Sequence, residues 1–88
     1  MEARIHQIII TRQAQKQIAD LPTSVQKKID KAIIGLKLQP RPDGAIRLKS
    51  DRNSYRIRVG NYRILYTIED AELKVITVKV GDRKEVYE

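Results

Sequence analysis

Three arginines near the middle of the chain, Arg56, Arg58 and Arg63, have the type and spacing that could bind a phosphate group. They belong to the stretch 55–66, in which two runs of β-branched and aromatic residues flank Gly60-Asn61. A glycine at the first of two loop positions is typical of the type II′ turn that joins two antiparallel strands. Because side chains alternate along a strand, the three arginines are expected to share one face of this hairpin.

The two-residue loop also sets which residues of the hairpin lie opposite one another. Arg58 is expected to face Arg63, and the same register pairs Val59 with Tyr62, Ile57 with Ile64 and Tyr55 with Tyr66. Two guanidinium groups directly opposite each other repel and weaken a sheet. We interpret the pair as an anion-binding feature, since the planar guanidinium matches the oxygens of a phosphate. The alternative is that these long side chains spread into water and have no function.

The net charge is +7, from 18 Lys and Arg against 11 Asp and Glu, and it is unevenly placed. Between positions 41 and 63, seven basic residues stand against two acidic ones, so five of the seven net charges fall there. The basic residues are Arg41, Arg47, Lys49, Arg52, Arg56, Arg58 and Arg63. A basic patch on a small domain favours nucleic acid or an acidic protein as the partner, and charge alone does not separate the two.

The length of 88 residues predicts a single domain, 1–88. With no cysteine and one histidine, no disulfide or zinc site is expected, and no cofactor motif is visible. No carboxylate cluster suggests a two-metal nuclease. The longest apolar run, Ile8–Ile10, is too short to span a membrane, and no signal peptide opens the chain. We therefore expect a cytoplasmic protein.

The segments before the hairpin predict one strand and two helices. Residues 5–10 form the strand, with His6 on its surface or edge. Thr11 is suited to cap a first helix, and Thr23 with Gln26 has the spacing of a capping box for a second helix that ends at 35–38. The apolar stripes of the two helices are Ala14, Ile18 and Leu21, and Val25, Ile29, Ala32, Ile33 and Leu36. Their short join predicts an antiparallel helical hairpin.

The later segments predict the rest of the sheet. A short extended piece at 45–49, in which Leu48 touches the core, follows a Pro- and Gly-rich break. After the hairpin, the mostly apolar run 73–80 predicts an interior strand. The order β-α-α-β-β-β indicates an α+β domain, with the helical hairpin on one face of a four-stranded antiparallel sheet. The arginines are then expected on the open face.

Two separated motifs carry a resemblance to a known family. The hairpin at 55–66 and the closing run Val80–Tyr87, taken together, resemble the RelE/ParE superfamily of toxins from type II toxin–antitoxin systems, and the RelE branch in particular. Leu48-Lys49 and residues 25–29 are also similar, so the match covers nearly the whole chain. The resemblance implies a RelE-like fold and a metal-independent endoribonuclease that cuts messenger RNA in the ribosomal A site. It further implies an acidic antitoxin as partner. The toxin would then contact operator DNA only through that antitoxin.

Carried over by position, the resemblance implies which residues form the site. Arg63, Arg83 and Tyr87 take the catalytic places. Arg56 and Arg58 take the places that position the RNA backbone, and the neighbouring Lys49, Arg47 and Arg52 extend the RNA-binding surface. Some relatives carry lysine where Arg56 and Arg58 stand, and many carry histidine where Asp82 stands. Asp82 places a negative charge next to Arg83.

The residue types suit metal-free RNA cleavage. The substrate's 2′-OH attacks the adjacent phosphorus and leaves a 2′,3′-cyclic phosphate and a 5′-OH, which requires a base, charge stabilisation and a proton for the leaving oxygen. Arg63 and Arg83 are assigned to charge stabilisation. Tyr87 could transfer a proton or stack on a base. The alternatives are a salt bridge of Arg83 with Asp82 or Glu85, and simple packing of Tyr87.

A second class of function stays open on the same fold. The chain could be a ParE-like poison of DNA gyrase, or a non-catalytic binding or repressor partner. The basic cluster with Tyr87 favours the nuclease, while Asp82 argues against it.

Overall fold

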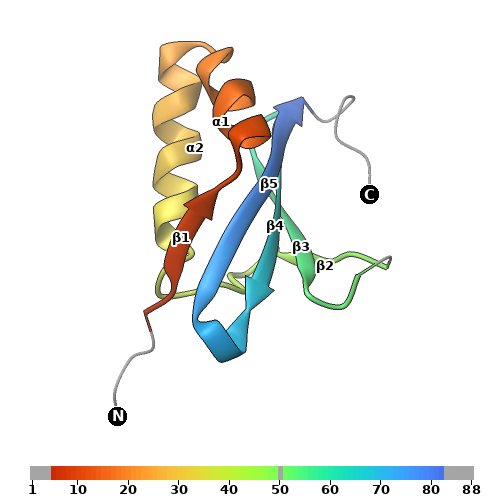
Figure 1. Ribbon diagram of the computed structural model, residues 1–88. Helices are drawn as coiled ribbons and strands as arrows, with labels where there is room; N and C mark the ends of the chain where they lie inside the picture. The colour runs from red at the N-terminus through yellow and green to blue at the C-terminus, as the bar shows by residue number, and fades with distance from the viewer. Residues whose placement is uncertain (1–4, 50, 83–88) are drawn as a thin grey trace.

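The computed structural model describes residues 5–49 and 51–82, which form two helices and a five-stranded sheet (Figure 1). The helices are α1 (Arg12–Ala19) and α2 (Thr23–Gly35), and a short 3₁₀ helix, η1, spans Asp70–Glu72. The strands are β1 (Gln7–Ile10), β2 (Ile46–Arg47), β3 (Ser54–Val59), β4 (Tyr62–Glu69) and β5 (Lys74–Asp82). Among these residues, no helix is long and apolar enough to cross a membrane.

The sheet has the order β1-β5-β4-β3-β2, which makes β5 an interior strand as predicted. The predicted α+β arrangement is confirmed, with two additions. The extended piece near residue 46 pairs with β3 as a fifth, two-residue strand. The first strand lies beside the last one and runs parallel to it, whereas all other neighbours are antiparallel. No local sequence pattern predicts this parallel pair, because its two strands are the first and the last of the chain and are not linked by a short turn.

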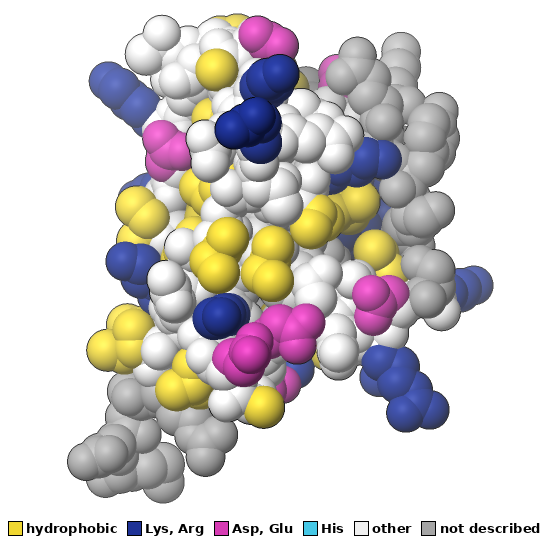
Figure 2. Space-filling model, in the orientation of Figure 1, with side chains coloured by type: hydrophobic (Ala, Val, Ile, Leu, Met, Phe, Trp, Pro, Cys, Tyr) yellow, Lys and Arg dark blue, Asp and Glu magenta, His cyan; other side chains and the backbone are white. Residues whose placement is uncertain are grey.

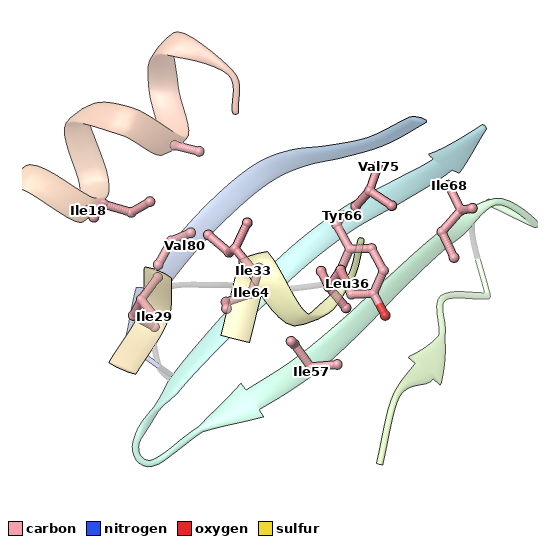
Figure 3. Packing of buried hydrophobic residues seen from close by; sticks show 11 residues of the cluster. Ile18, Ile29, Ile33, Leu36, Ile57, Ile64, Tyr66, Ile68, Val75 and Val80 are labelled. Atoms are coloured by element: carbon pink, nitrogen blue, oxygen red, sulfur yellow. The ribbon is translucent and has the colours of Figure 1, made fainter. Parts of the chain in front are cut away.

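Both helices cover the same face of the sheet, and the hydrophobic core lies between the two layers (Figures 1 and 3). Its members come from the apolar stripes of the two helices and from the helix-facing positions of β3, β4 and β5. The buried residues of this cluster are Ala14, Ile18, Ile29, Ile33, Leu36, Ile57, Ile64, Tyr66, Ile68, Val75 and Val80. Burying each large aliphatic side chain stabilises the fold by roughly 1.5–3 kcal/mol. The core therefore fixes β3 and β4 against the helices and leaves their other face available.

The capping predictions are right for the first helix and wrong for the second. The Thr11 side chain accepts a hydrogen bond from the backbone N–H of Ala14 at 3.2 Å. The second helix has Pro22 as its N-cap, with no side-chain cap. Gln26 instead donates its side-chain N–H to the carbonyl of Leu21 at 2.8 Å. The Gln26 side chain, which would complete a capping box, is thus used to hydrogen-bond the turn between the two helices.

His6 lies at the edge strand of the sheet, which is one of its two predicted positions. The residue is only 5% exposed, so the other predicted position, on the surface, is wrong. The segment that follows α2 lies next to this position: the backbone N–H of His6 donates to the carbonyl of Lys37 at 2.8 Å. The imidazole Nε2 lies 3.5 Å from the Asp70 carboxylate. His6 therefore belongs to the packing of the sheet edge.

Candidate nucleic-acid interface

The hairpin is formed by β3 and β4, and its predicted register is confirmed. Arg58 lies directly opposite Arg63, and the other three predicted pairs also form. Gly60, at the first loop position, has a φ of 61°, and Asn61 is not among the residues with positive φ. Glycine adopts this conformation without steric cost, as a type II′ turn requires. The turn therefore fixes the arginine pair.

The second row of the sheet from the turn contains Arg58, Arg63 and Gly81 on β3, β4 and β5. Directly opposite residues share a face, and Ile57 and Ile64, which alternate with the arginines, are buried against the helices. The arginines therefore point from the face that the helices leave open, as predicted. Arg58 is exposed and Arg63 is half-buried. Two guanidinium groups on adjacent strands could bind the oxygens of one phosphate.

The next row contains Arg56, Leu65 and Lys79. Sequence reasoning missed Lys79, because strict alternation from Lys74 would place it on the helix-covered face. A β-bulge between β4 and β5 changes this alternation: Leu65 pairs with Lys79, but Tyr66 pairs with Thr77. The extra residue on β5 is Val78, so Lys79 lies on the same face as Leu65. Bulges re-aim side chains in this way.

A small apolar cluster underlies this basic face. Leu48 and Leu65 are 8% and 6% exposed, and Val78 packs against them. The backbone N–H of Leu48 donates to the carbonyl of Ser54 at 2.8 Å, which holds the loop after β2 against β3. Leu48 thus contacts a second cluster on the open face and not the main core. Lys49, the next residue, is exposed beside it.

The remaining predicted site residues are distributed more widely. Arg52 is exposed in the loop before β3. Arg47 is exposed but lies opposite Tyr55, whose ring packs against the main core, so it starts from the face opposite to Arg56. Arg83 and Tyr87 lie outside the described residues, and the roles assigned to all these residues stay predictions.

The negative charge of Asp82 was expected to neutralise part of the anion-binding site. It lies directly opposite Tyr62, and Tyr62 packs against the main core. By register, its side chain therefore starts from the helix-covered side of the sheet, while Arg63 starts from the open side. The alternation of β5 thus separates this carboxylate from the arginine pair.

Arg41 belongs to the basic stretch, but its contacts are made with the protein itself. Its guanidinium donates to both carboxylate oxygens of Asp70, at 2.8 and 3.4 Å, and its Nε donates to the Tyr55 hydroxyl at 3.0 Å. These hydrogen bonds lower the pKa of Asp70 and raise the pKa of Arg41. Arg41 therefore serves the loop between α2 and β2 and does not contribute to the arginine face.

Tyr66 completes this structural network below Arg41. Its hydroxyl donates to the Pro40 carbonyl at 2.7 Å, and its ring stacks on Tyr55 with centroids 6.0 Å apart. Burial raises the pKa of Tyr66 to about 12, so the hydroxyl stays a neutral donor over the physiological range. The loop that carries Arg41 is thus fixed at its start.

A groove of about 440 Å³ lies between α2 and the outer edge of β3. Its apolar lining is Ala32, Gly35, Leu36, Pro42, Ile46 and Ile57, and its charged lining is Lys31, Asp43, Arg56 and Arg58. The strand β2 pairs only with Tyr55 and Arg56, so no described strand pairs with the outer edge of β3 beyond them. The groove thus combines an apolar floor, an excess of positive charge and free backbone hydrogen-bonding groups.

Comparison with known proteins decides the family. Residues 8–87 match the family described as "ParE toxin of type II toxin-antitoxin system, parDE". The "Putative toxin RelE1" of Methanocaldococcus jannaschii is 32% identical over 81 residues, which cover 89% of this chain and 90% of that protein. The chain belongs to the RelE/ParE family of type II toxins. The resemblance found in the sequence is thereby confirmed.

Solved structures support the RelE-like fold of this toxin. The archaeal RelE–RelB complex from Pyrococcus horikoshii has a TM-score of 0.82 at 22% identity, covering 93% of this chain and 99% of that one. The RelBE2 complex of Mycobacterium tuberculosis has a TM-score of 0.79 at 22% identity, covering 90% and 99%. The RelB–RelE complex from Methanococcus jannaschii has a TM-score of 0.72 at 28% identity, covering 90% and 94%. In all three, the relative is in complex with an antitoxin.

In this toxin the open sheet face is the candidate nucleic-acid interface. It carries Arg56, Arg58, Arg63 and Lys79 above a small apolar cluster. Figure 2 shows that, on the side facing the viewer in Figure 1, Lys and Arg side chains are scattered over the surface, and one of them lies directly beside a group of acidic side chains low at the centre. Within the described residues, no group of three His, Asp or Glu side chains could hold a metal ion. The charged groups that the described part of this face presents include the cations of Arg56, Arg58, Arg63 and Lys79.

Proposed function

We propose that this toxin is an mRNA endoribonuclease that acts on the ribosome in the cytoplasm, inhibits translation and is neutralised by a cognate antitoxin. The observation that carries the proposal is the pair of opposing arginines, Arg58 and Arg63, on the open sheet face. A sheet does not gain stability from such a pair. A phosphate could accept hydrogen bonds from both guanidinium groups, and a message held in the ribosomal A site supplies phosphates in a fixed geometry.

The proposed reaction follows from these groups. The message's own 2′-OH attacks the adjacent phosphorus, and the P–O5′ bond breaks to give a 2′,3′-cyclic phosphate and a 5′-OH. Arg63, with Arg83 as its predicted partner, stabilises the negative charge of the phosphorane. Arg56 and Arg58 position the RNA backbone, and Tyr87 is the predicted group for proton transfer or base stacking.

Expression of the toxin without its antitoxin should arrest bacterial growth and truncate messages within codons. The measurement is mapping of RNA 5′ ends after induction, beside an assay for chromosomal breaks. Intact messages alongside broken DNA would reject the nuclease and favour a gyrase poison. Normal growth with intact messages would favour a non-catalytic partner.

The groove beside α2 supports an antitoxin as the partner. Relatives of similar fold have been crystallised with RelB antitoxins. The excess of basic residues around the groove suits an acidic segment, and its apolar floor suits alternate hydrophobic side chains. A segment seated there would lie against Arg56 and Arg58 and would compete with RNA for them. Part of its ordering would occur on binding.

Gly35→Leu should weaken antitoxin binding by at least about tenfold while leaving the toxin folded. A Cβ at Gly35 meets no atom within 4 Å, so the new side chain projects into the groove. Replacing a helical glycine should also raise stability by up to about 1 kcal/mol. The measurement is calorimetric titration with the antitoxin, beside thermal melting of the free toxin. Lys27→Leu, on the exposed side of α2, is the control and should bind normally. Equal affinities of the two variants would place the antitoxin elsewhere.

A further inference from the structure

We propose that Lys79 is a catalytic residue of this toxin, whose ammonium group contacts the scissile phosphate and donates the proton to the leaving 5′ oxygen. The inference rests on the proposed endoribonuclease function and adds a residue and a role to it.

The position of Lys79 in the sheet is the first argument. Lys79 lies opposite Leu65, and Arg63 is two residues from Leu65 on the same face. Diagonal neighbours of this kind in an antiparallel pair are about 7–8 Å apart, within reach of one phosphate for two long side chains. The residue directly opposite Arg63 is Gly81, which has no side chain. Lys79 is therefore the nearest β5 side chain to Arg63 on this face.

The bulge in β5 is the second argument. If β5 alternated regularly through Val78, without a bulge, Lys79 would face the helices, as Thr77 does. The bulge brings Val78 into the apolar cluster with Leu48 and Leu65, and it places Lys79 beside that cluster. A bulge interrupts the hydrogen-bond ladder, and such features recur next to active sites because they re-aim a side chain.

The charges around Lys79 are the third argument. The other lysine on this face of β5 is Lys74, which is opposite Glu69 and lies 3.7 Å from the Glu72 carboxylate. No carboxylate of the described residues forms an ion pair with Lys79. Lys79 is nevertheless half-buried and diagonal to an arginine. An unpaired ammonium beside a guanidinium is an arrangement that a bound phosphate would stabilise.

The chemistry assigns a proton-transfer role to Lys79 and not to its neighbours. An arginine stays protonated in proteins, so Arg56, Arg58 and Arg63 can stabilise charge but do not readily release a proton. An ammonium group can release one. As the 2′ oxygen attacks phosphorus, the electrons of the breaking P–O5′ bond go to O5′, which takes a proton from Lys79. The 2′-OH proton goes to a base, for which the ionised form of Tyr87 is the predicted candidate. That base then gives the proton to water, and the neutral amine regains one from water.

The experiment compares two ribosome-bound messages, one with oxygen and one with sulfur at the bridging 5′ position of the scissile phosphate. A thiolate leaves without being protonated, so the sulfur message does not need an acid. In single-turnover cleavage, Lys79→Met should be slower than wild type by on the order of 10²-fold on the oxygen message. It should cut the sulfur message at nearly the wild-type rate. Lys79→Arg should behave like Lys79→Met, because it keeps the charge without the transferable proton. Lys74→Met is the control and should match wild type on both.

Equal losses on the two messages, a wild-type rate for Lys79→Arg on the oxygen message, or no loss for Lys79→Met would each overturn the assignment. If Lys79→Met fails to fold in a melting assay, the ratio of the two rates in Lys79→Arg decides the question. A wild-type toxin that cuts neither ribosome-bound message would reject the proposed function itself, whereas the outcomes above reject only the role of Lys79.

Discussion

Arg63→Ala should lower the rate of message cleavage on the ribosome by on the order of 10²-fold, the usual effect of removing one preorganised donor to a developing oxyanion. Arg63 is the member of the opposing pair that lies in the middle strand of the three that carry the basic face. A phosphate above this face is thus flanked by cations from both sides. The measurement is single-turnover cleavage at saturating ribosome, with binding measured at the same salt concentration.

Binding should change far less than cleavage, because several other basic residues hold the RNA backbone. Arg63→Lys should restore only part of the rate, since an ammonium group cannot make the two-pronged contact. Arg41→Ala is the matched control, because Arg41 is committed to Asp70 and Tyr55. It should leave cleavage unchanged. If Arg63→Ala reduced binding and cleavage in equal proportion, Arg63 would be a docking residue and its catalytic assignment would be wrong.

The arginine face could be predicted from sequence because two local rules determine it. A two-residue turn sets the register of a hairpin, and the period of two then assigns every side chain of both strands to a face. The positions of Arg58 opposite Arg63 and of Ile57 opposite Ile64 follow from these rules alone. The helix-covered face follows as well, because the apolar stripes of two helices need one apolar sheet face to cover.

The parts that could not be predicted depend on contacts between distant segments. The bulge at Val78 is a property of the pairing between β4 and β5, and nothing in the local sequence marks it. Lys79 was missed for that reason. His6 is buried where the chain is bonded to Lys37, in the segment after α2 and some thirty residues away in the sequence. The count of basic residues between 41 and 63 likewise treated Arg41 as available, although Asp70 neutralises it from another element.

Ile64 is the residue next to Arg63 on β4. Ile64→Ala should have the opposite effect to Arg63→Ala: a large loss of stability with little loss of cleavage rate. Ile64 is fully buried, lies opposite Ile57 and Val80, and packs among the aliphatic side chains of the core in Figure 3. Truncating a buried isoleucine costs about 2–5 kcal/mol, since apolar contact is lost and a cavity remains. For a domain of this size, whose stability is roughly 4–13 kcal/mol, this is a large fraction. The melting temperature should fall by on the order of 10 °C or more.

Cleavage by the molecules that remain folded should nevertheless stay within a few fold of wild type, because the Ile64 side chain is on the face opposite to the arginines. The measurement is thermal melting, beside single-turnover cleavage at a temperature well below the transition. Ile46→Ala, which truncates an isoleucine that is 49% exposed, is the control and should melt close to wild type. If Ile64→Ala melted normally yet lost cleavage, the division into a supporting face and a reacting face would fail. In a sheet with one covered face, neighbouring residues of a strand point to different faces. One should therefore affect stability and the other the cleavage rate.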